Sequence, residues 1–458
     1  MKKPLAVKLT MMIGIIIFLL IPISQIDGIV DERKSLQKNV IKEIASSSST
    51  EQLLIGPILI QPFVETSTSW QTTPDGNEKT LITTKTEGKL QFLPDSLNAH
   101  IELKNELRSR GIYDSKIYHA KTKLTGHFSI PKNFGLSDMA KIELGQPYLL
   151  ISVSDMRGIK SSVHIDLNGN KLEVKPGSNH TFFSQGIHSF IPTITNQGAD
   201  LDFTISMNFQ GSSRLEFIPI GKENMFQLQS DWPHPSFGGR YLPTERKITT
   251  QGFFSTWEMS RFSTNIQSLA NKCLNNKLCT DFKATKFGVS FIDPVDVYVK
   301  IDRSVKYAIL FIILTFVAFF LFELLKDLRI HPVQYALVGL AIAIFYLLLL
   351  SLSEHIDFSI AYAISSLSCA ALIGSYISSA LKSKRRGLAF SFYLTLLYIL
   401  LYGLISSEDY ALLIGSILCF IVLSAVMTLT REVDWYKTSS QMNFNEAPNS
   451  NKPSIAPK

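Results

Sequence analysis

Six long apolar runs divide the chain into membrane-spanning and polar parts. Each run has 18 to 24 residues, close to the roughly 20 that an α-helix needs to cross the hydrocarbon core of a bilayer. The runs are Leu9–Ile26, Tyr307–Leu325, Val333–Leu352, Phe358–Leu381, Gly387–Ile405 and Tyr410–Thr430. Only the second contains an acidic residue, Glu323, near its end. The pattern therefore predicts six transmembrane helices.

The basic residues that flank these runs lie at alternate ends. They are Lys2, Lys3, Lys8, Lys326, Arg329, Lys382, Lys384, Arg385 and Arg386. The other short loops, 353–357 and 406–409, contain acids but neither Lys nor Arg. Short loops rich in Lys and Arg stay in the cytoplasm. We therefore expect a multi-pass protein with both termini cytoplasmic and residues 27–304 on the outer side.

The first apolar run has two interpretations, an uncleaved anchor or a cleaved signal peptide. Its 18 residues are long for a signal peptide, and Ser24-Gln25-Ile26-Asp27 offers no small-residue cleavage site. An anchor is therefore favoured. Apolar residues at helical spacing follow it as far as Ile44, so a helix is expected to continue outward until Ser46–Thr50.

Alternation of apolar and polar residues dominates the long polar part. Leu201–Phe209 alternates strictly, and Val163–Val174 contains Asn168-Gly169, the strongest short signal for a β-hairpin. The run Val295–Ile301 also alternates and predicts a last strand next to the second span. About 250 residues of mostly strand indicate a β-sandwich-like domain.

The predicted fold is thus an α+β membrane protein with a large β-rich domain inserted between helices 1 and 2. The expected divisions are residues 1–26 (cytoplasmic tip and first helix), 27–304 (β-rich periplasmic domain), 305–430 (five-helix bundle) and 431–458 (cytoplasmic tail).

Composition agrees with a membrane protein. The chain is 46% hydrophobic and only 18% charged, and its mean hydropathy is +0.16. The formal net charge of +7 is spread along the chain, so no basic patch predicts binding to nucleic acid. The partner that the composition indicates is the lipid bilayer.

Cysteine usage suggests one pair at most. Cys273 and Cys279 both lie in the polar domain, where an oxidising compartment would permit a local disulfide, and free thiols are the open alternative. Two thiols do not make a metal site. Cys369 and Cys419 lie in apolar runs and are expected to pack as small apolar residues.

No nucleotide-binding, zinc-protease or nucleophile-elbow motif occurs in the sequence. No catalytic residue, cofactor or metal is therefore predicted. Glu323 is a candidate proton or ion site, although a carboxylate near the cytoplasmic interface, paired with Lys326 or Arg329, is the favoured interpretation. Glu354 and His355 are a second candidate, with a polar cap at the outer end of the third span as the favoured alternative.

The segment Asp231–Phe237 is a candidate contact surface in the polar domain. Two prolines stiffen it, and Trp232, His234 and Phe237 follow at short intervals. A rigid corner of the sheet with buried aromatic side chains is the simpler interpretation.

Several stretches resemble the CreD family of bacterial inner-membrane proteins. They include Lys306–Leu310, Phe319–Glu323, Arg329–Gly339 (which contains His331), Phe345–Leu350, Ser353–His355, Trp232–Phe237, Tyr241–Pro243, Asp155–Ile159, Gly56-Pro57 and Asp434–Tyr436. The resemblance implies an inner-membrane location and a role in cell-envelope integrity and envelope stress. It implies no reaction, so it transfers no catalytic residue. Arg329 and His331 join Glu323, Glu354 and His355 as candidate functional residues.

The leading hypothesis is a non-enzymatic envelope protein whose β-rich domain binds an envelope component or an envelope protein. The alternative is a small proton-coupled transporter or exporter that uses Glu323. A periplasmic hydrolase is third, because no nucleophile–base or metal constellation is visible from residue spacing.

Overall fold

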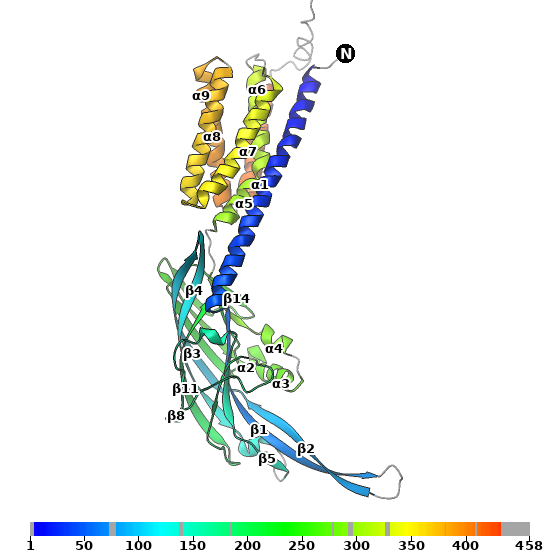
Figure 1. Cartoon of the computed structure of the whole chain (residues 1–458), viewed down its shortest axis with the longest axis vertical. Coiled ribbons are helices and arrows are strands. Elements are labelled where there is room, and N and C mark those ends of the chain that lie inside the picture. The colour runs from blue at the N-terminus through cyan, green and yellow to red at the C-terminus, as the bar shows by residue number, and fades with distance from the viewer. Residues whose placement is uncertain are drawn as a thin grey trace, which may run out of the picture. The chain divides into compact units, whose positions relative to one another are not determined.

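The structure is a computed structural model, and it describes residues 4–72, 79–136, 141–183, 185–276, 279–291, 296–325, 330–380, 382–407 and 410–431. The chain divides into two compact units. One, the helical unit, consists of Met1–Leu36 and Val295–Lys458, and the other, the β unit, is Gln37–Pro294. Together they confirm the predicted α+β architecture, in which a large β-rich insertion follows the first helix (Figure 1).

The helical unit contains long apolar helices. Its elements are the first part of α1 (Pro4–Ser48), α5 (Val297–Lys306), α6 (Ala308–Leu325), α7 (Pro332–Ser353), α8 (Phe358–Ala380), α9 (Lys384–Ser406) and α10 (Ala411–Thr430). By length and composition, five helices of the described residues could each cross a membrane, and α5 with α6, bent by 45°, could form a sixth crossing. The helix expected to continue beyond the first span is confirmed, because α1 ends at Ser48.

The predicted strand Val295–Ile301 is wrong over the residues that the structure describes. Residues from Val297 onward form helix α5, and Val295 lies outside the described residues. Asp296 caps this helix by accepting a hydrogen bond from the Tyr298 amide at 2.9 Å. Tyr298, Ile301 and Val305 are buried at helical spacing, so the apparent alternation was one face of an amphipathic helix.

The β unit is built from two sheets. Sheet A has the strand order β14-β17-β12-β1-β6-β10-β9, with β2 and β5 also paired to β1, and sheet B has the order β15-β16-β13-β3-β4-β11-β7-β8. The strands are β1 (Gln52–Thr72), β2 (Lys79–Phe92), β3 (Ser96–Arg110), β4 (Tyr113–Ile130), β5 (Ile142–Leu144), β6 (Tyr148–Val153), β7 (His164–Leu167), β8 (Asn170–Leu172), β9 (Lys175–Pro176), β10 (Ile187–Phe190), β11 (Ala199–Ser212), β12 (Arg214–Phe217), β13 (Glu223–Ser230), β14 (Pro235–Gly239), β15 (Glu245–Thr249), β16 (Gly252–Ser260) and β17 (Phe287–Phe291).

Short helices and turns complete the β unit. They are η1 (Lys132–Gly135), η2 (Met156–Gly158), α2 (Arg261–Thr264), α3 (Ile266–Asn276) and α4 (Thr280–Ala284). In Figure 1 the strands β1 and β2 continue beyond the body of the unit as a two-stranded ribbon.

One hydrophobic core joins the two sheets. Ile58 and Leu149 contribute to it from sheet A, and Ile101 and Ile205 contribute from sheet B. The alternation predicted for residues 201–209 is confirmed in β11, where every second side chain from Phe203 onward is buried. The hairpin at Asn168-Gly169 is also confirmed, since β7 pairs with β8 and both turn residues have positive φ. Strands of sheet B such as β3 and β4 therefore bury one face, whereas β6 of sheet A is buried at every position.

A buried carboxylate fastens the C-terminal end of α1 to the β unit. Asp155 accepts hydrogen bonds from the Thr50 amide at 3.1 Å and from the Arg157 guanidinium at 2.7 Å. Arg157 in turn donates to the backbone carbonyl of Ser46 on α1. These hydrogen bonds from Arg157 hold the pKa of the Asp155 carboxyl well below its usual range, so the carboxylate stays charged. The contacts of Asp155 and Arg157 at the end of α1 are therefore explained by a structural role, without catalysis.

Cys273 and Cys279 form a disulfide across helix α3 and the start of α4. We predict that thiol labelling of the denatured full-length protein, quenched in acid directly from membranes, will modify two cysteines before reduction and four after it. The two would be Cys369 and Cys419, which are free thiols in the structure. Labelling of four cysteines without reduction would show that the pair does not form in the cell.

His180 gives the β unit a predicted dependence on pH. Burial lowers the pKa of His180 to about 4, and the nearby Lys89 adds to this shift. An unfolded histidine binds its proton near pH 6.5. Stability should therefore fall as the pH drops from about 6.5 towards 4, because only the unfolded state gains the proton over that range.

We compare the urea unfolding of the full-length wild-type protein with that of His180→Gln. Unfolding is monitored by tryptophan fluorescence, to which the buried Trp257 contributes. We expect the wild-type midpoint to decline more steeply below pH 6.5 than that of the variant. Parallel pH profiles for the two proteins would refute the assignment.

Candidate functional site

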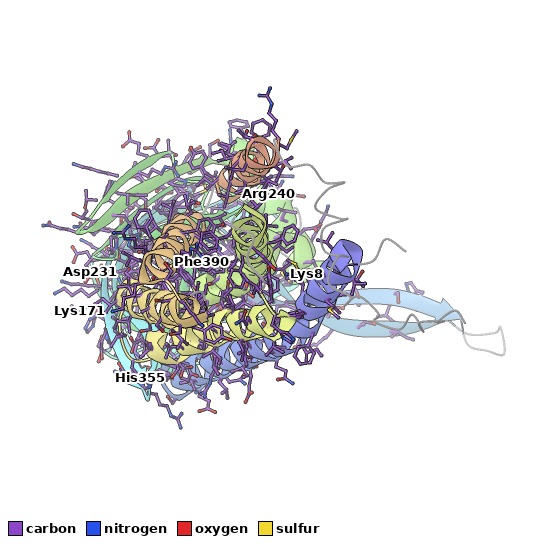
Figure 2. The ribbon with its side chains drawn as sticks, turned by 90° about the horizontal axis from the view of Figure 1, so that it is seen from above. Lys8, Lys171, Asp231, Arg240, His355 and Phe390 are labelled. Atoms are coloured by element: carbon purple, nitrogen blue, oxygen red, sulfur yellow. A yellow bond between two sulfur atoms is a disulfide. The ribbon has the colours of Figure 1, made fainter. Side chains whose placement is uncertain are left out.

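Glu323, the acid in the second apolar run, is buried in an ion pair. Its side chain is 7% exposed, and its partner is Lys8 of α1. The carboxylate also accepts hydrogen bonds from the Ile330 amide at 3.1 Å and the Tyr335 hydroxyl at 3.0 Å. Lys8 is labelled on α1 in Figure 2. Both carboxylate oxygens are thus occupied by donors from three separate parts of the helical unit.

The partner of Glu323 differs from the one expected. The sequence suggested Lys326 or Arg329, and both lie outside the described residues. Lys8 is 315 positions away in the chain, so no local spacing rule could have identified it. Its ammonium group also donates to the Ile330 carbonyl at 3.3 Å and lies 5.9 Å from the centre of the Tyr335 ring.

His331 begins helix α7 and acts there as a cap. Its Nδ1 accepts a hydrogen bond from the Val333 amide at 3.3 Å, and the Gln334 side chain accepts one from the His331 amide at 3.2 Å. This reciprocal arrangement is a capping box with Pro332 in the first turn. The contacts of His331 are therefore those of a helix start.

Glu354 and His355 follow the last turn of α7 and face different surroundings. Glu354 accepts a hydrogen bond from the Tyr298 hydroxyl at 3.1 Å, and Arg33 of α1 lies 3.5 Å from the same oxygen. His355 is exposed and its amide donates to Leu352. The two side chains are thus not joined in one site, and the polar-cap interpretation fits Glu354.

The Trp232–Phe237 segment packs against its own unit. The Lys116 ammonium lies 3.9 Å from the centre of the Trp232 ring, and Phe237 contacts Phe253 and Trp257 in β16 at ring separations of 5.5 and 5.7 Å. His234 is exposed. Two of the three candidate contact residues therefore have packing partners inside the β unit.

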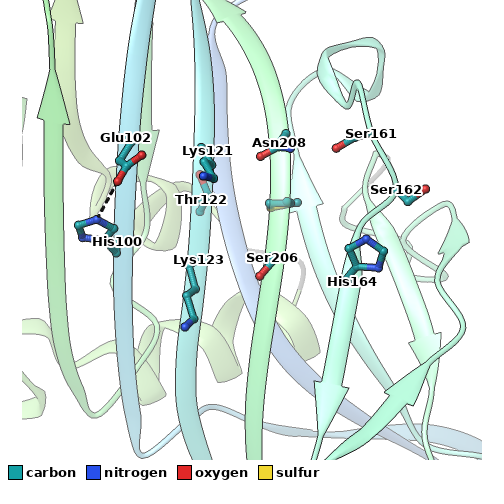
Figure 3. Close-up of a pocket in the computed structure, with 11 residues that line it drawn as sticks. His100, Glu102, Lys121, Thr122, Lys123, Ser161, Ser162, His164, Ser206 and Asn208 are labelled. Atoms are coloured by element: carbon teal, nitrogen blue, oxygen red, sulfur yellow. Dashed lines mark ion pairs between the residues drawn. The ribbon is translucent and has the colours of Figure 1, made fainter.

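A hollow on the polar face of sheet B was not anticipated from the sequence. It is a groove of about 500 Å³ (Figure 3), with an adjoining recess of about 350 Å³. The polar side chains that line these two hollows are His100, Glu102, Lys104, His119, Lys121, Thr122, Lys123, Lys160, Ser161, Ser162, His164, Ser206 and Asn208. From here on, the groove means the two hollows together, with these lining residues.

Strand register brings these residues into rows. His100 of β3 pairs with Lys123 of β4, which pairs with Ser206 of β11, and Ser206 pairs with His164 of β7. A second row contains Glu102, Lys121 and Asn208. Strands lie about 4.8 Å apart, so each row places its side chains next to one another across the floor, as Figure 3 shows.

A short segment before β7 forms one wall. The Lys160 amide donates to the Asn208 carbonyl at 3.3 Å, and Ile159 forms an isolated bridge with Phe209. Lys160, Ser161 and Ser162 are exposed beside β11. A backbone-anchored wall therefore faces an open polar floor.

The groove holds hydrogen-bond donors and positive charge rather than a metal site. Among the described residues, no group of three or more His, Cys, Asp or Glu side chains is placed to hold a metal ion. Within the groove, the His100 ring lies 3.5 Å from the Glu102 carboxylate. The residue types present can bind a polar ligand by hydrogen bonds and charge.

Solved structures give only weak similarities. A mutant M1 zinc metallopeptidase from Deinococcus radiodurans aligns with 36% of this chain and 38% of its own, at 10% identity and a TM-score of 0.22. Leukotriene A4 hydrolase from Saccharomyces cerevisiae aligns with 37% of this chain and 27% of its own, at 11% identity and a TM-score of 0.20. Scores of this size identify no common fold, so neither match bears on function.

Sequence comparison is much more informative. The family described as "Inner membrane protein CreD" matches residues 4–436 of this chain. The inner membrane protein CreD of Escherichia coli (strain K12) is 36% identical over 446 residues, which cover 96% of this chain and 95% of that protein. With its long apolar helices and inserted β unit, the chain therefore belongs to the CreD family of inner membrane proteins.

Proposed function

We propose that this protein supports the integrity of the cell envelope by binding an envelope component in the groove of its β unit, without catalysis. The observation that carries the proposal is the groove itself, an open hollow of about 500 Å³. This volume lies within the range of small-ligand sites. Its exposed lysine, serine and histidine side chains come from four strands that the sandwich core holds in register.

The proposal includes the orientation derived from charge. Both termini lie in the cytoplasm and residues 27–304 lie in the periplasm, between the spans 1–26 and 305–430, with 431–458 as a cytoplasmic tail. The support is the alternation of Lys- and Arg-containing loops with acidic ones. In this orientation the groove faces envelope material.

The alternative, proton-coupled transport through Glu323, has less support. A coupling carboxylate must exchange its proton with a water-filled path. Glu323 is instead buried, and it is bonded to Lys8, Tyr335 and the Ile330 amide. These contacts pair the carboxylate with a cation and two further hydrogen-bond donors, so they favour a structural role.

The first prediction concerns the groove in cells. Ser206 is exposed at the centre of the floor, so Ser206→Trp should fill the hollow while the inward face of β11 stays unchanged. In a strain lacking this protein, we expect Ser206→Trp to leave the envelope as permeable to a large dye as the empty vector does. Wild type should restore the barrier.

Ser129→Trp is the matched control, because Ser129 is exposed on β4 and is not among the residues that line the groove. It should rescue fully, with membrane levels of all variants checked by immunoblotting. If Ser206→Trp rescued at normal abundance, the groove would not be the functional site.

The second prediction separates structure from transport at Glu323. Glu323→Leu leaves the Lys8 ammonium buried without a carboxylate, which should cost about 3–5 kcal/mol of stability. The double variant Lys8→Met/Glu323→Leu removes both charges together. It should melt close to the wild-type temperature, because replacing a whole buried ion pair with apolar side chains is often neutral.

Melting is measured on the purified full-length protein in detergent, and rescue is measured in the same permeability assay. We expect the double variant to be abundant and fully functional. A double variant that is stable and abundant but fails to rescue would show that ionisation of Glu323 is required, and transport would become the better proposal.

A further inference from the structure

We infer that the groove binds a phosphorylated saccharide, with its lysines on the phosphate groups and its hydroxyl and amide side chains on the sugar. This inference rests on the proposed binding function and adds the chemical class of the ligand.

The charge of the groove is the first reason. Lys104, Lys121, Lys123 and Lys160 line the hollows, and Glu102 is the one acidic side chain among the lining residues. Glu102 lies beside His100. Among the residues that the structure describes, none of the four lysines has an ion-pair partner within 4 Å. Four lysines against one carboxylate give the groove an excess of positive charge towards an incoming ligand.

Some lysines of the same unit do have carboxylate partners. Lys286 lies 2.9 Å from Glu216, and Lys222 forms an ion pair with Asp95. On a surface whose charges serve only solubility, positive and negative side chains are interspersed, as they are in these two ion pairs. In the groove, by contrast, four lysines without a carboxylate partner lie close together.

The polar face of sheet B changes sign along its strands. Farther along β4 and β11, His127 lies 2.8 Å from Asp202 and 3.3 Å from Asp200. The hydrogen bond that the His127 ring donates to Asp202 raises the pKa of His127. An anion would be attracted to the lysine end of this face and repelled from the end that carries the aspartates. This difference in charge sets where an anionic ligand binds and which way round it lies.

The residue types favour phosphate over carboxylate. Arginine forms the planar, two-pronged contacts that suit carboxylates, whereas lysine acts as a mobile point charge and is a common phosphate ligand. None of the residues that line the two hollows is an arginine. Lys121 and Lys123 project from the same face of β4, about 7 Å apart along the strand, so they can close on one phosphate or hold two neighbouring ones.

The remaining side chains favour a sugar over a lipid tail. Ser161, Ser162, Ser206 and Asn208 are exposed around the lysines. Hydroxyl and amide groups both donate and accept hydrogen bonds, as sugar hydroxyls require. The apolar lining residues Met207 and Phe209 are each about 2% exposed, so neither of these side chains offers a contact surface to an acyl chain.

The inference is tested by binding to the full-length protein in detergent, with glucose 1,6-bisphosphate as the probe. Titration calorimetry compares wild type with Lys121→Gln/Lys123→Gln. The matched control, Lys132→Gln/Lys171→Gln, removes the same charge from exposed lysines of the β unit that do not line the groove. We expect the groove variant to bind about tenfold more weakly or worse, and the control variant to bind like wild type.

Glucose and citrate complete the design. Glucose without phosphate should bind far more weakly, and citrate should not match the bisphosphate. Equal losses in both lysine variants would show a general charge effect, equal binding of citrate would show an anion site without phosphate preference, and either result would overturn the inference.

The outcome is separable from that of the proposed function. If Ser206→Trp abolishes rescue but the bisphosphate does not bind, the groove is functional and its ligand belongs to another class. If the bisphosphate binds and Ser206→Trp still rescues, the ligand assignment stands and the proposed role of the groove falls.

Discussion

The buried ion pair between Lys8 and Glu323 is the interaction on which the helical unit depends. The β insertion separates α1 from α6 by more than 250 residues, so chain connectivity does little to keep the two helices together. A carboxylate that is 7% exposed must be neutralised. Within the part of the chain that the structure describes, Lys8 of α1 is the cation that pairs with it, and this contact ties α1 to α6.

Further ion pairs repeat this arrangement elsewhere along α1. Lys34 lies 3.5 Å from Asp302 of α5, and Arg33 lies 3.5 Å from Glu354. Apolar side chains associate weakly in lipid because the tails are equally apolar, so polar contacts carry more of the specificity of helix packing in a membrane. Residues at two levels of α1, Lys8 near its start and the adjacent Arg33 and Lys34, therefore fix its register against helices that lie far away in the sequence.

Much of the fold follows from local patterns, and much of the candidate site does not. The apolar runs, the alternation of β11 and the Asn168-Gly169 hairpin depend on neighbouring residues, so the sequence predicts them correctly. Helix α5 was misjudged because Val297, Val299 and Ile301 satisfy a period of two, while the burial of Tyr298 and Val305 follows a helix. Short amphipathic segments leave this ambiguity open.

The groove and the Lys8 contact were missed for a different reason. His100, Lys123, Ser206 and His164 become neighbours only through the register of four strands. In the sequence they look like solvated residues on the outer face of separate strands. One positional rule still offered a clue, because outward positions of adjacent strands carry several lysines and histidines but few acids. To use this clue, one must know which residues of neighbouring strands lie opposite one another.

The arrangement of histidines in and beside the groove favours binding over catalysis. His119 lies 2.9 Å from Glu106, and such a pair can serve a general base. A base also needs a nucleophile within hydrogen-bond reach, and among the described residues no hydrogen bond joins a groove serine to a groove histidine. The proposed anion binding, in contrast, requires only lysines that lie near one another without carboxylate partners, as the four in the groove do. The same strands thus bury an apolar face that holds the sandwich together and expose a charged face whose geometry the core fixes.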